Sequence, residues 1–161
     1  MKYKSFDTPR LKCRPFVMRD LDEFYSLISD DELIQKYFRF GNTRGEVAEF
    51  LIGLQDVSNP VIADAILLKS TSEMIGYISG YLTNSAEFCI EYFISQEHRR
   101  HHYVLEALSN YIVFRRLEGY SSFCFNVEVD NKASMLALQK FGANFSKTFV
   151  NAGRTFNVYT L

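Results

Sequence analysis

Three apolar segments follow one another through the middle of the chain, joined by connections too short for anything but hairpins. They are PVIADAILLK (60–69), MIGYISGYLT (74–83) and EFCIEYFI (87–94), separated by STSE and NSA. Connections of three or four residues join antiparallel strands, because a parallel pair needs a crossover of a dozen residues or more. The sequence therefore predicts an antiparallel, three-stranded meander at the centre of the fold.

The next segments require a parallel pair. Residues 103–117 carry apolar side chains at helical spacing, Gly119 follows as a helix end, and SSFCFNVEV (121–129) has the composition of a strand. A strand–helix–strand unit places its two strands in parallel through a right-handed crossover. A helix over 132–142 and closing strands over 144–150 and 154–161 follow. The predicted fold is α/β (α+β), a mixed and mostly antiparallel sheet with helices on both faces.

The first third of the chain contributes a strand and several helices. RLKCRPF (10–16) alternates polar and apolar residues, and the apolar residues of the next segment have helical spacing behind Asp20, a candidate N-cap. A short helix is expected in ELIQKYFRFGN, ending at Gly41-Asn42. Thr43 and Glu46 then have the spacing of a capping box at the start of another helix.

Composition limits the class of protein. A chain of 161 residues with 47% hydrophobic residues suits a single domain spanning 1–161. The formal net charge of −1 argues against a protein that coats nucleic acid, which needs a strongly basic face. Cys13, Cys89 and Cys124 lie among apolar residues and are expected to be buried free thiols. Neither a secretory leader nor a membrane span is recognised, so a cytoplasmic location is expected.

Several short motifs occur in one order along the chain. They are Thr8-Pro9-Arg10-Leu11 with Arg14-Pro15, Gly76 in EMIGYISGY, Glu106-Ala107-Leu108, and Asn131 and Ser134 followed by Lys140-Phe141-Gly142. Together with the element order, they resemble the GNAT superfamily of acyl-CoA-dependent N-acetyltransferases. The resemblance is greatest to the RimJ/RimL branch, which acetylates ribosomal-protein N-termini, and to its small-molecule-modifying relatives.

The resemblance implies a reaction and a set of contacts. An acetyl group would pass from acetyl-CoA directly to a primary amine of a small molecule or a protein N-terminus, without a metal. Acetyl-CoA would lie between the parallel strands, held by the backbone of Phe93 and Ile94. Asn131 would contact the CoA arm or cap its helix, and Ser134 would donate a proton to the leaving thiolate. Pairing of two subunits is common in this superfamily, so a homodimer is possible.

The segment that would bind the pyrophosphate departs from the family pattern. The family loop reads Gln/Arg-x-x-Gly-x-Gly/Ala, and Glu97, Arg100 and His102 stand at its first, fourth and sixth positions. Glycine at such positions lets backbone N–H groups approach a phosphate closely. The start of the helix at Tyr103, together with Arg99, Arg100, His101 and His102, could compensate. Three outcomes remain open: a weaker CoA site, a degenerate site in a non-catalytic binding or sensor module, or an unusual acyl donor.

Glu91 is the first candidate for the general base. It interrupts the apolar run CIEYF, where it is either functional or simply the exposed residue of an alternating strand. Glu128 is a weaker candidate, and Asn126 could hydrogen-bond the CoA arm or a bridging water. The acceptor site is expected between residues 31–46 and 150–157, with Tyr37, Phe38, Phe40 and Phe156 as candidate wall residues.

Two other readings of HRRHH are less favoured. His98, His101 and His102 have the i, i+3, i+4 spacing of metal ligands on a helix. They precede the helix, however, and lie beside two arginines that repel a cation, so no metal site is expected. A nucleic-acid site built on the same residues is disfavoured by the near-neutral net charge.

Overall fold

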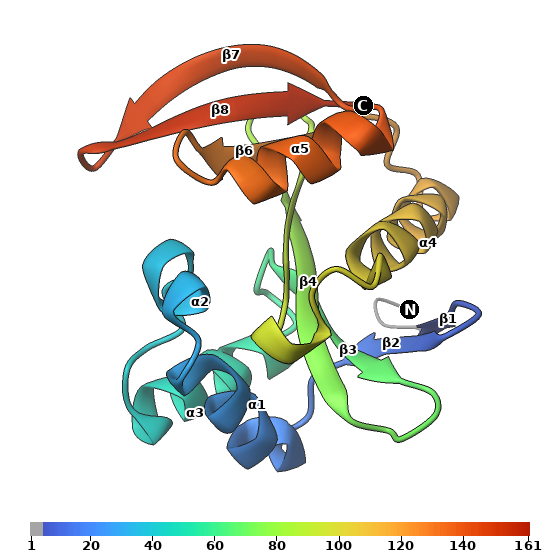
Figure 1. Cartoon of the computed structure of the whole chain (residues 1–161), viewed down its shortest axis with the longest axis vertical. Coiled ribbons are helices and arrows are strands. Elements are labelled where there is room, and N and C mark those ends of the chain that lie inside the picture. Colours follow the sequence, from blue (N-terminus) through green and yellow to red (C-terminus); the bar gives the residue numbers. More distant parts are fainter. Residues whose placement is uncertain (1–4) are drawn as a thin grey trace.

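The computed structural model describes residues 5–161, and this part of the chain forms an eight-stranded sheet in the order β1-β2-β3-β4-β5-β6-β8-β7 (Figure 1). The strands are β1 (Phe6–Asp7), β2 (Leu11–Pro15), β3 (Ile62–Leu68), β4 (Met74–Leu82), β5 (Phe88–Ile94), β6 (Phe123–Glu128), β7 (Asn144–Asn151) and β8 (Arg154–Thr160). Neighbouring strands are antiparallel except for the parallel pair β5–β6. The predicted meander and crossover are confirmed; the two-residue β1 has too little pattern to be predicted.

Helices cover both faces of the sheet. They are α1 (Leu21–Ser29), α2 (Glu32–Tyr37), α3 (Arg44–Gln55), α4 (Tyr103–Leu117) and α5 (Lys132–Phe141). Figure 1 shows α1, α2 and α3 on one side of the central strands and α4 on the other. Each face has its own hydrophobic cluster, one including side chains of α4 and α5 and the other side chains of α1, α2 and α3. The predicted fold class is therefore confirmed.

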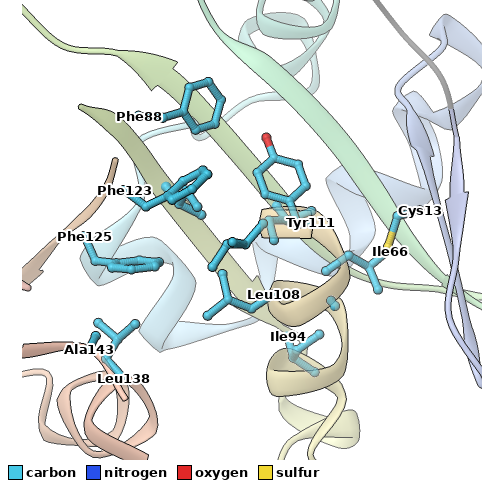
Figure 2. Packing of buried hydrophobic residues seen from close by; sticks show 14 of the residues in the cluster. Cys13, Ile66, Phe88, Ile94, Leu108, Tyr111, Phe123, Phe125, Leu138 and Ala143 are labelled. Carbon is cyan, nitrogen blue, oxygen red and sulfur yellow. The ribbon is translucent and has the colours of Figure 1, made fainter. Parts of the chain in front are cut away.

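The cluster around α4 fixes the helix that leads to the parallel pair. Leu108 and Tyr111 of α4 lie against the strands that carry Phe88 and Phe123 (Figure 2). Apolar spacing predicts the bounds of α4 well, yet it misses a buried cation on the same face. Arg115 is 1% exposed; it is ion-paired with the buried Asp64 and the partly exposed Glu118, and it lies over the ring of Tyr111.

Three local expectations have different outcomes. Asp20 takes the N-cap position of α1 as expected, but its side chain makes no cap bond; both carboxylate oxygens accept bonds from the Arg14 guanidinium, at 2.7 and 2.8 Å. The short helix α2 ends at Tyr37, before the Gly41-Asn42 pair that was expected to end it. The capping box of Thr43 and Glu46 forms as predicted and opens α3.

Candidate active site

The parallel strands β5 and β6 separate after two residues. Their register contains only the pairs Phe88–Phe123 and Cys89–Cys124, although both strands continue beyond them. The N–H of Phe88 donates to the carbonyl of Ser122 at 2.8 Å, toward β6. Because N–H groups alternate in direction along a strand, those of Tyr92 and Ile94 face the same way, into the opening left by β6.

Phe93 has its backbone turned toward β4 instead. The N–H of Ser95 donates to Ile75 of β4, so by alternation the N–H of Phe93 points to β4 as well. A Cβ added to Gly76 of β4 would collide with the carbonyl oxygen of Phe93, which places that oxygen on the same side. The role of Ile94 stays a prediction that this geometry fits. The register argues against a backbone contact from Phe93 to the CoA arm. It makes the N–H of Tyr92 a candidate for that contact, which sequence reasoning missed.

Two cavities meet at the opening. The larger, of about 990 Å³, lies between α2, the end of β5, residues 96–104 and α5. The smaller, of about 230 Å³, lies between β5, β6, the end of α2 and the β7–β8 hairpin. Residues common to both linings are Tyr37, Phe38, Tyr92, Asn131 and Ser134. A ligand in the larger cavity can therefore reach a second ligand in the smaller one.

A pair of hydroxyl groups stands where the cavities meet. The oxygens of Tyr92 and Ser134 are 3.1 Å apart, and burial raises the pKa of Tyr92 to about 12. Asn131 caps α5, since its Oδ1 accepts a bond of 3.3 Å from the N–H of Ser134. The capping alternative for Asn131 is thus confirmed, and the cap places Ser134 beside Tyr92.

Two carboxylates line the smaller cavity in different settings. Glu91 is exposed, which is one of the two alternatives expected for it, and it lines the smaller cavity. The protein around its carboxylate nevertheless desolvates it and raises its pKa. Glu128 is ion-paired with Arg154, whose guanidinium also lies over the ring of Phe156. Glu91 therefore remains the better candidate for a base, because Glu128 is neutralised. Asn126 lines the same cavity.

The loop before α4 has a left-handed backbone at two residues that are not glycine. Arg100 and His102 have φ angles of 66° and 62°, in the left-handed region that costs residues with a Cβ about 1–2 kcal/mol each. These are the two positions matched to the family glycines, and both line the larger cavity. The exposed His101 stacks on Tyr103, with ring centres 5.6 Å apart.

Asp31 holds this loop from the opposite wall, and sequence reasoning missed it. Its carboxylate caps α2 by accepting bonds from the N–H groups of Leu33 and Ile34. It also accepts bonds from the N–H of Gln96, at 3.1 Å, and from Arg99, at 2.5 Å. The run SDDEL carries an N-cap signal, but no local signal indicates the bond to Arg99. Arg99 is therefore occupied by an acid of the same chain.

The N-terminal motif and the Glu-Ala-Leu motif form one contact. Glu106, in the first turn of α4, accepts bonds from the Thr8 hydroxyl at 2.5 Å and from the Arg10 backbone and Nε at 2.8 and 2.7 Å. Arg10 also reaches the carbonyl of His101 and lies over the ring of Tyr103. Residues nearly a hundred positions apart thus fix the start of α4.

The histidines do not gather as a helical metal site would require. Among the described residues, the grouping with metal-ligand spacing is Glu73, Glu97 and His98, whose ligand atoms lie within 4.8 Å of one another. His98 is held there by a bond of 2.9 Å between its Nδ1 and the Ser95 hydroxyl. Of the expected acceptor-wall residues, Tyr37, Phe38 and Phe156 line the smaller cavity, whereas Phe40 is buried in the core beneath α1–α3.

The geometry of the site is thus a mixed sheet that opens between two parallel strands, with a cavity at the N-terminal end of the crossover helix. The sequence profile of the acetyltransferase (GNAT) domain matches residues 10–144. The chain therefore belongs to the GNAT acetyltransferase family. No curated protein sequence matches the chain.

Solved structures agree with the fold. The chain superposes on RimL, a ribosomal L7/L12 alpha-N-protein acetyltransferase, with a TM-score of 0.87 and 14% identity, covering 99% of this chain and 94% of the other. A GCN5-related N-acetyltransferase from Brucella melitensis superposes with a TM-score of 0.82 and 19% identity. The superposition covers 98% of this chain and 78% of the other. The microcin C7 self-immunity acetyltransferase MccE, solved with acetyl-CoA and AMP, superposes with a TM-score of 0.80 and 18% identity. The superposition covers 95% of this chain and 92% of the other. No helix in residues 5–161 is long and apolar enough to cross a membrane.

Proposed function

We propose that this protein transfers an acetyl group from acetyl-CoA to a primary amine. The observation that carries the proposal is the meeting of the two cavities at Tyr92 and Ser134, beside the strand opening. One cavity has room for a long donor, and the other has room for a small acceptor. Solved relatives in complex with acetyl-CoA or with coenzyme A support the choice of donor.

The larger cavity fits acetyl-CoA, which would supply the acetyl group as an activated thioester. The N–H groups of Tyr92 and Ile94 face the opening and can bind polar atoms of the acyl-bearing arm. The N-terminus of α4 favours an anion through its dipole and free N–H groups. Arg100 and His102 lie on the cavity wall beside it, and both side chains could donate to a diphosphate.

The residues of this chain divide the proton transfers between them. Glu91 would accept a proton from the acceptor amine, and its raised pKa makes it a stronger base than an ordinary glutamate. Ser134 would donate a proton to the departing thiolate and regain one from Tyr92 across their 3.1 Å contact. Exchange with solvent would then return a proton to Tyr92 and remove the amine proton from Glu91. The base thus lines only the smaller cavity, whereas the donor pair lines both cavities.

A second candidate function is a non-catalytic GNAT module. The loop observations favour it: two residues with a Cβ occupy the glycine positions, and Arg99 is already paired with Asp31. Such a module would keep the fold and bind CoA weakly or not at all. The two candidates differ in a quantity that can be measured directly, the affinity for acetyl-CoA.

Calorimetric titration with acetyl-CoA separates the candidates, with Arg100→Glu alongside the unchanged protein. Micromolar binding that is lost in Arg100→Glu supports a working donor site in which Arg100 contacts the diphosphate. An absence of binding at millimolar acetyl-CoA would reject the acetyl-CoA reaction and leave the non-catalytic module. Release of free thiol in the presence of amines, measured on the same samples, then reports turnover.

A further inference from the structure

Among the residues that the structure describes, the smaller cavity has one carboxylate without an ion-pair partner and one cation that is already paired. Of the described residues in its lining, those with charged side chains are Glu91, Glu128 and Arg154. Arg154 is ion-paired with Glu128, and it also donates to the carbonyl of Tyr37 at 3.5 Å. The pair is largely buried, with side chains 24% and 15% exposed. The charge left for a ligand is the negative charge of Glu91.

Aromatic rings make up much of the remaining wall. They come from the end of α2, from β4 and β6 and from the terminal hairpin: Tyr37, Phe38, Tyr81, Phe125, Phe149 and Phe156. Phe149 and Phe156 stack on each other with ring centres 5.2 Å apart. A wall of this kind binds apolar and aromatic groups, and the faces of its rings attract a cation.

We propose, resting on the N-acetyltransferase function above, that the acceptor is a small amine with one positive charge, an apolar or aromatic body and no acidic group. Its ammonium group would lie at Glu91 and its body among the rings. An amino acid would bring a carboxylate that finds no free cation, because Arg154 is held by Glu128. A polyamine would bring a second ammonium that finds no second unpaired carboxylate, and an unpaired charge in a partly buried site is costly.

A matched pair of amines tests the proposal. 2-Phenylethylamine and phenylalanine differ only by a carboxylate, and spermidine and a short peptide with an N-terminal serine represent the other classes. Binding of each is measured by calorimetry with and without CoA, and acetylation is measured by mass spectrometry with acetyl-CoA. 2-Phenylethylamine should bind at least about tenfold more tightly than phenylalanine and than spermidine. Equal or reversed affinities, or a preference for the serine peptide, would overturn the proposal.

A charge variant adds a gain of function. In Glu128→Gln, Arg154 loses its partner charge and becomes available to a carboxylate. The preference for 2-phenylethylamine over phenylalanine should shrink by about tenfold, because phenylalanine gains affinity. An unchanged preference would show that Arg154 does not exclude acids. If Glu128→Gln does not fold, the ratio of the affinities for 2-phenylethylamine and phenylalanine in the unchanged protein still tests the proposal. The donor titration judges the acetyltransferase function separately: amine discrimination without acetyl-CoA binding would retain the amine site and reject the reaction.

Discussion

Arg99 and Asp31 are joined by an ion pair of 2.5 Å between Nη2 and Oδ2, which connects the loop before α4 to the first residue ahead of α2. The same guanidinium donates through Nε to the carbonyl of Ile94 at 2.9 Å. Arg99, which was expected to bind a phosphate, thus connects the two walls of the larger cavity. The shape of that cavity depends on an acid that lies outside the family motifs.

Replacing Asp31 should weaken this brace in two separable steps. Asp31→Asn keeps a good N-cap but leaves Arg99 without its charge partner, which should lower the free energy of unfolding by about 1.5–3 kcal/mol. Asp31→Ala also removes the cap and should cost about 1 kcal/mol more. Urea unfolding measures both. Asp30→Ala, at an exposed neighbour, is the control and should stay within about 0.5 kcal/mol.

The left-handed backbone at His102 predicts an inverted preference between glycine and alanine. At ordinary positions alanine is the more stabilising residue, but a positive φ penalises any Cβ. His102→Gly should therefore be more stable than His102→Ala by about 1 kcal/mol. Both variants remove the imidazole, so thermal or urea unfolding isolates the backbone effect. The glycine variant should also bind acetyl-CoA more tightly than the alanine variant; an alanine advantage in stability would contradict the backbone geometry.

Glu91→Gln should abolish most of the activity if Glu91 is the base. Loss of a general base lowers kcat by about 10²–10⁴-fold. In the unchanged protein, kcat/KM should rise with pH through a group whose pKa lies above the usual 4.5 of glutamate. This rise of kcat/KM with pH should disappear in Glu91→Gln. If the variant keeps the rise, the titrating group is a residue other than Glu91.

The same substitution has a consequence for stability. A carboxyl group whose pKa is raised by folding favours the folded state most when it is protonated, below its unfolded value of about 4.5. This contribution is lost as the pH rises through the folded value. The stability of Glu91→Gln relative to the unchanged protein should therefore increase between pH 4 and neutral pH. Unfolding curves across that range check the sign.

Tyr92 and Ser134 should behave as one unit in catalysis. Ser134→Ala and Tyr92→Phe are each expected to lower kcat by roughly tenfold or more, as removal of a proton donor does. Because the two hydroxyls share one contact, the double variant should lose less than the product of the single losses. Affinity for CoA, measured by calorimetry, should change little. Tyr120→Phe, outside both cavity linings, provides a control that should keep full activity.

The buried pair of Asp64 and Arg115 should matter for stability alone. Its atoms are 3.1 Å apart, and the two side chains are 2% and 1% exposed. Asp64→Ala would leave a buried cation without this partner and should cost about 3–5 kcal/mol in urea unfolding. Asp64→Leu combined with Arg115→Met removes both charges and should recover much of that loss. If the double variant is as unstable as Asp64→Ala, the charge is not the cause.

Periodicity and turn chemistry predicted most of the fold, because they are local signals. The bounds of α4, the capping box at Thr43 and the parallel pair all follow from spacing that a single segment contains. Arg115 could not be placed by the same means, since its partner Asp64 is 51 residues away on a strand of apolar neighbours.

The candidate site was predictable only in part, for the same reason. Glu91, Ser134 and the loop residues could be chosen from the sequence, and all except His101 line one of the two cavities. The direction of a backbone N–H depends on strand register, so Tyr92 could not be preferred to Phe93. The occupation of Arg99 by Asp31 depends on the packing of α2, which no motif describes.

Between β5 and β6, only two residue pairs are in register, so the stability of the sheet and the access of a ligand to its backbone compete at this point. Beyond Cys89, the edge of β5 faces the opening, and its N–H groups on that side could bind a neighbouring strand as readily as a ligand. A sequence in which the strands stayed together for two more residues would gain ladder bonds and lose the passage. Substitutions that lengthen the pairing of β5 and β6 would therefore stabilise the sheet and close the opening between the two strands. The most informative stabilised variants will be those that leave this opening unchanged.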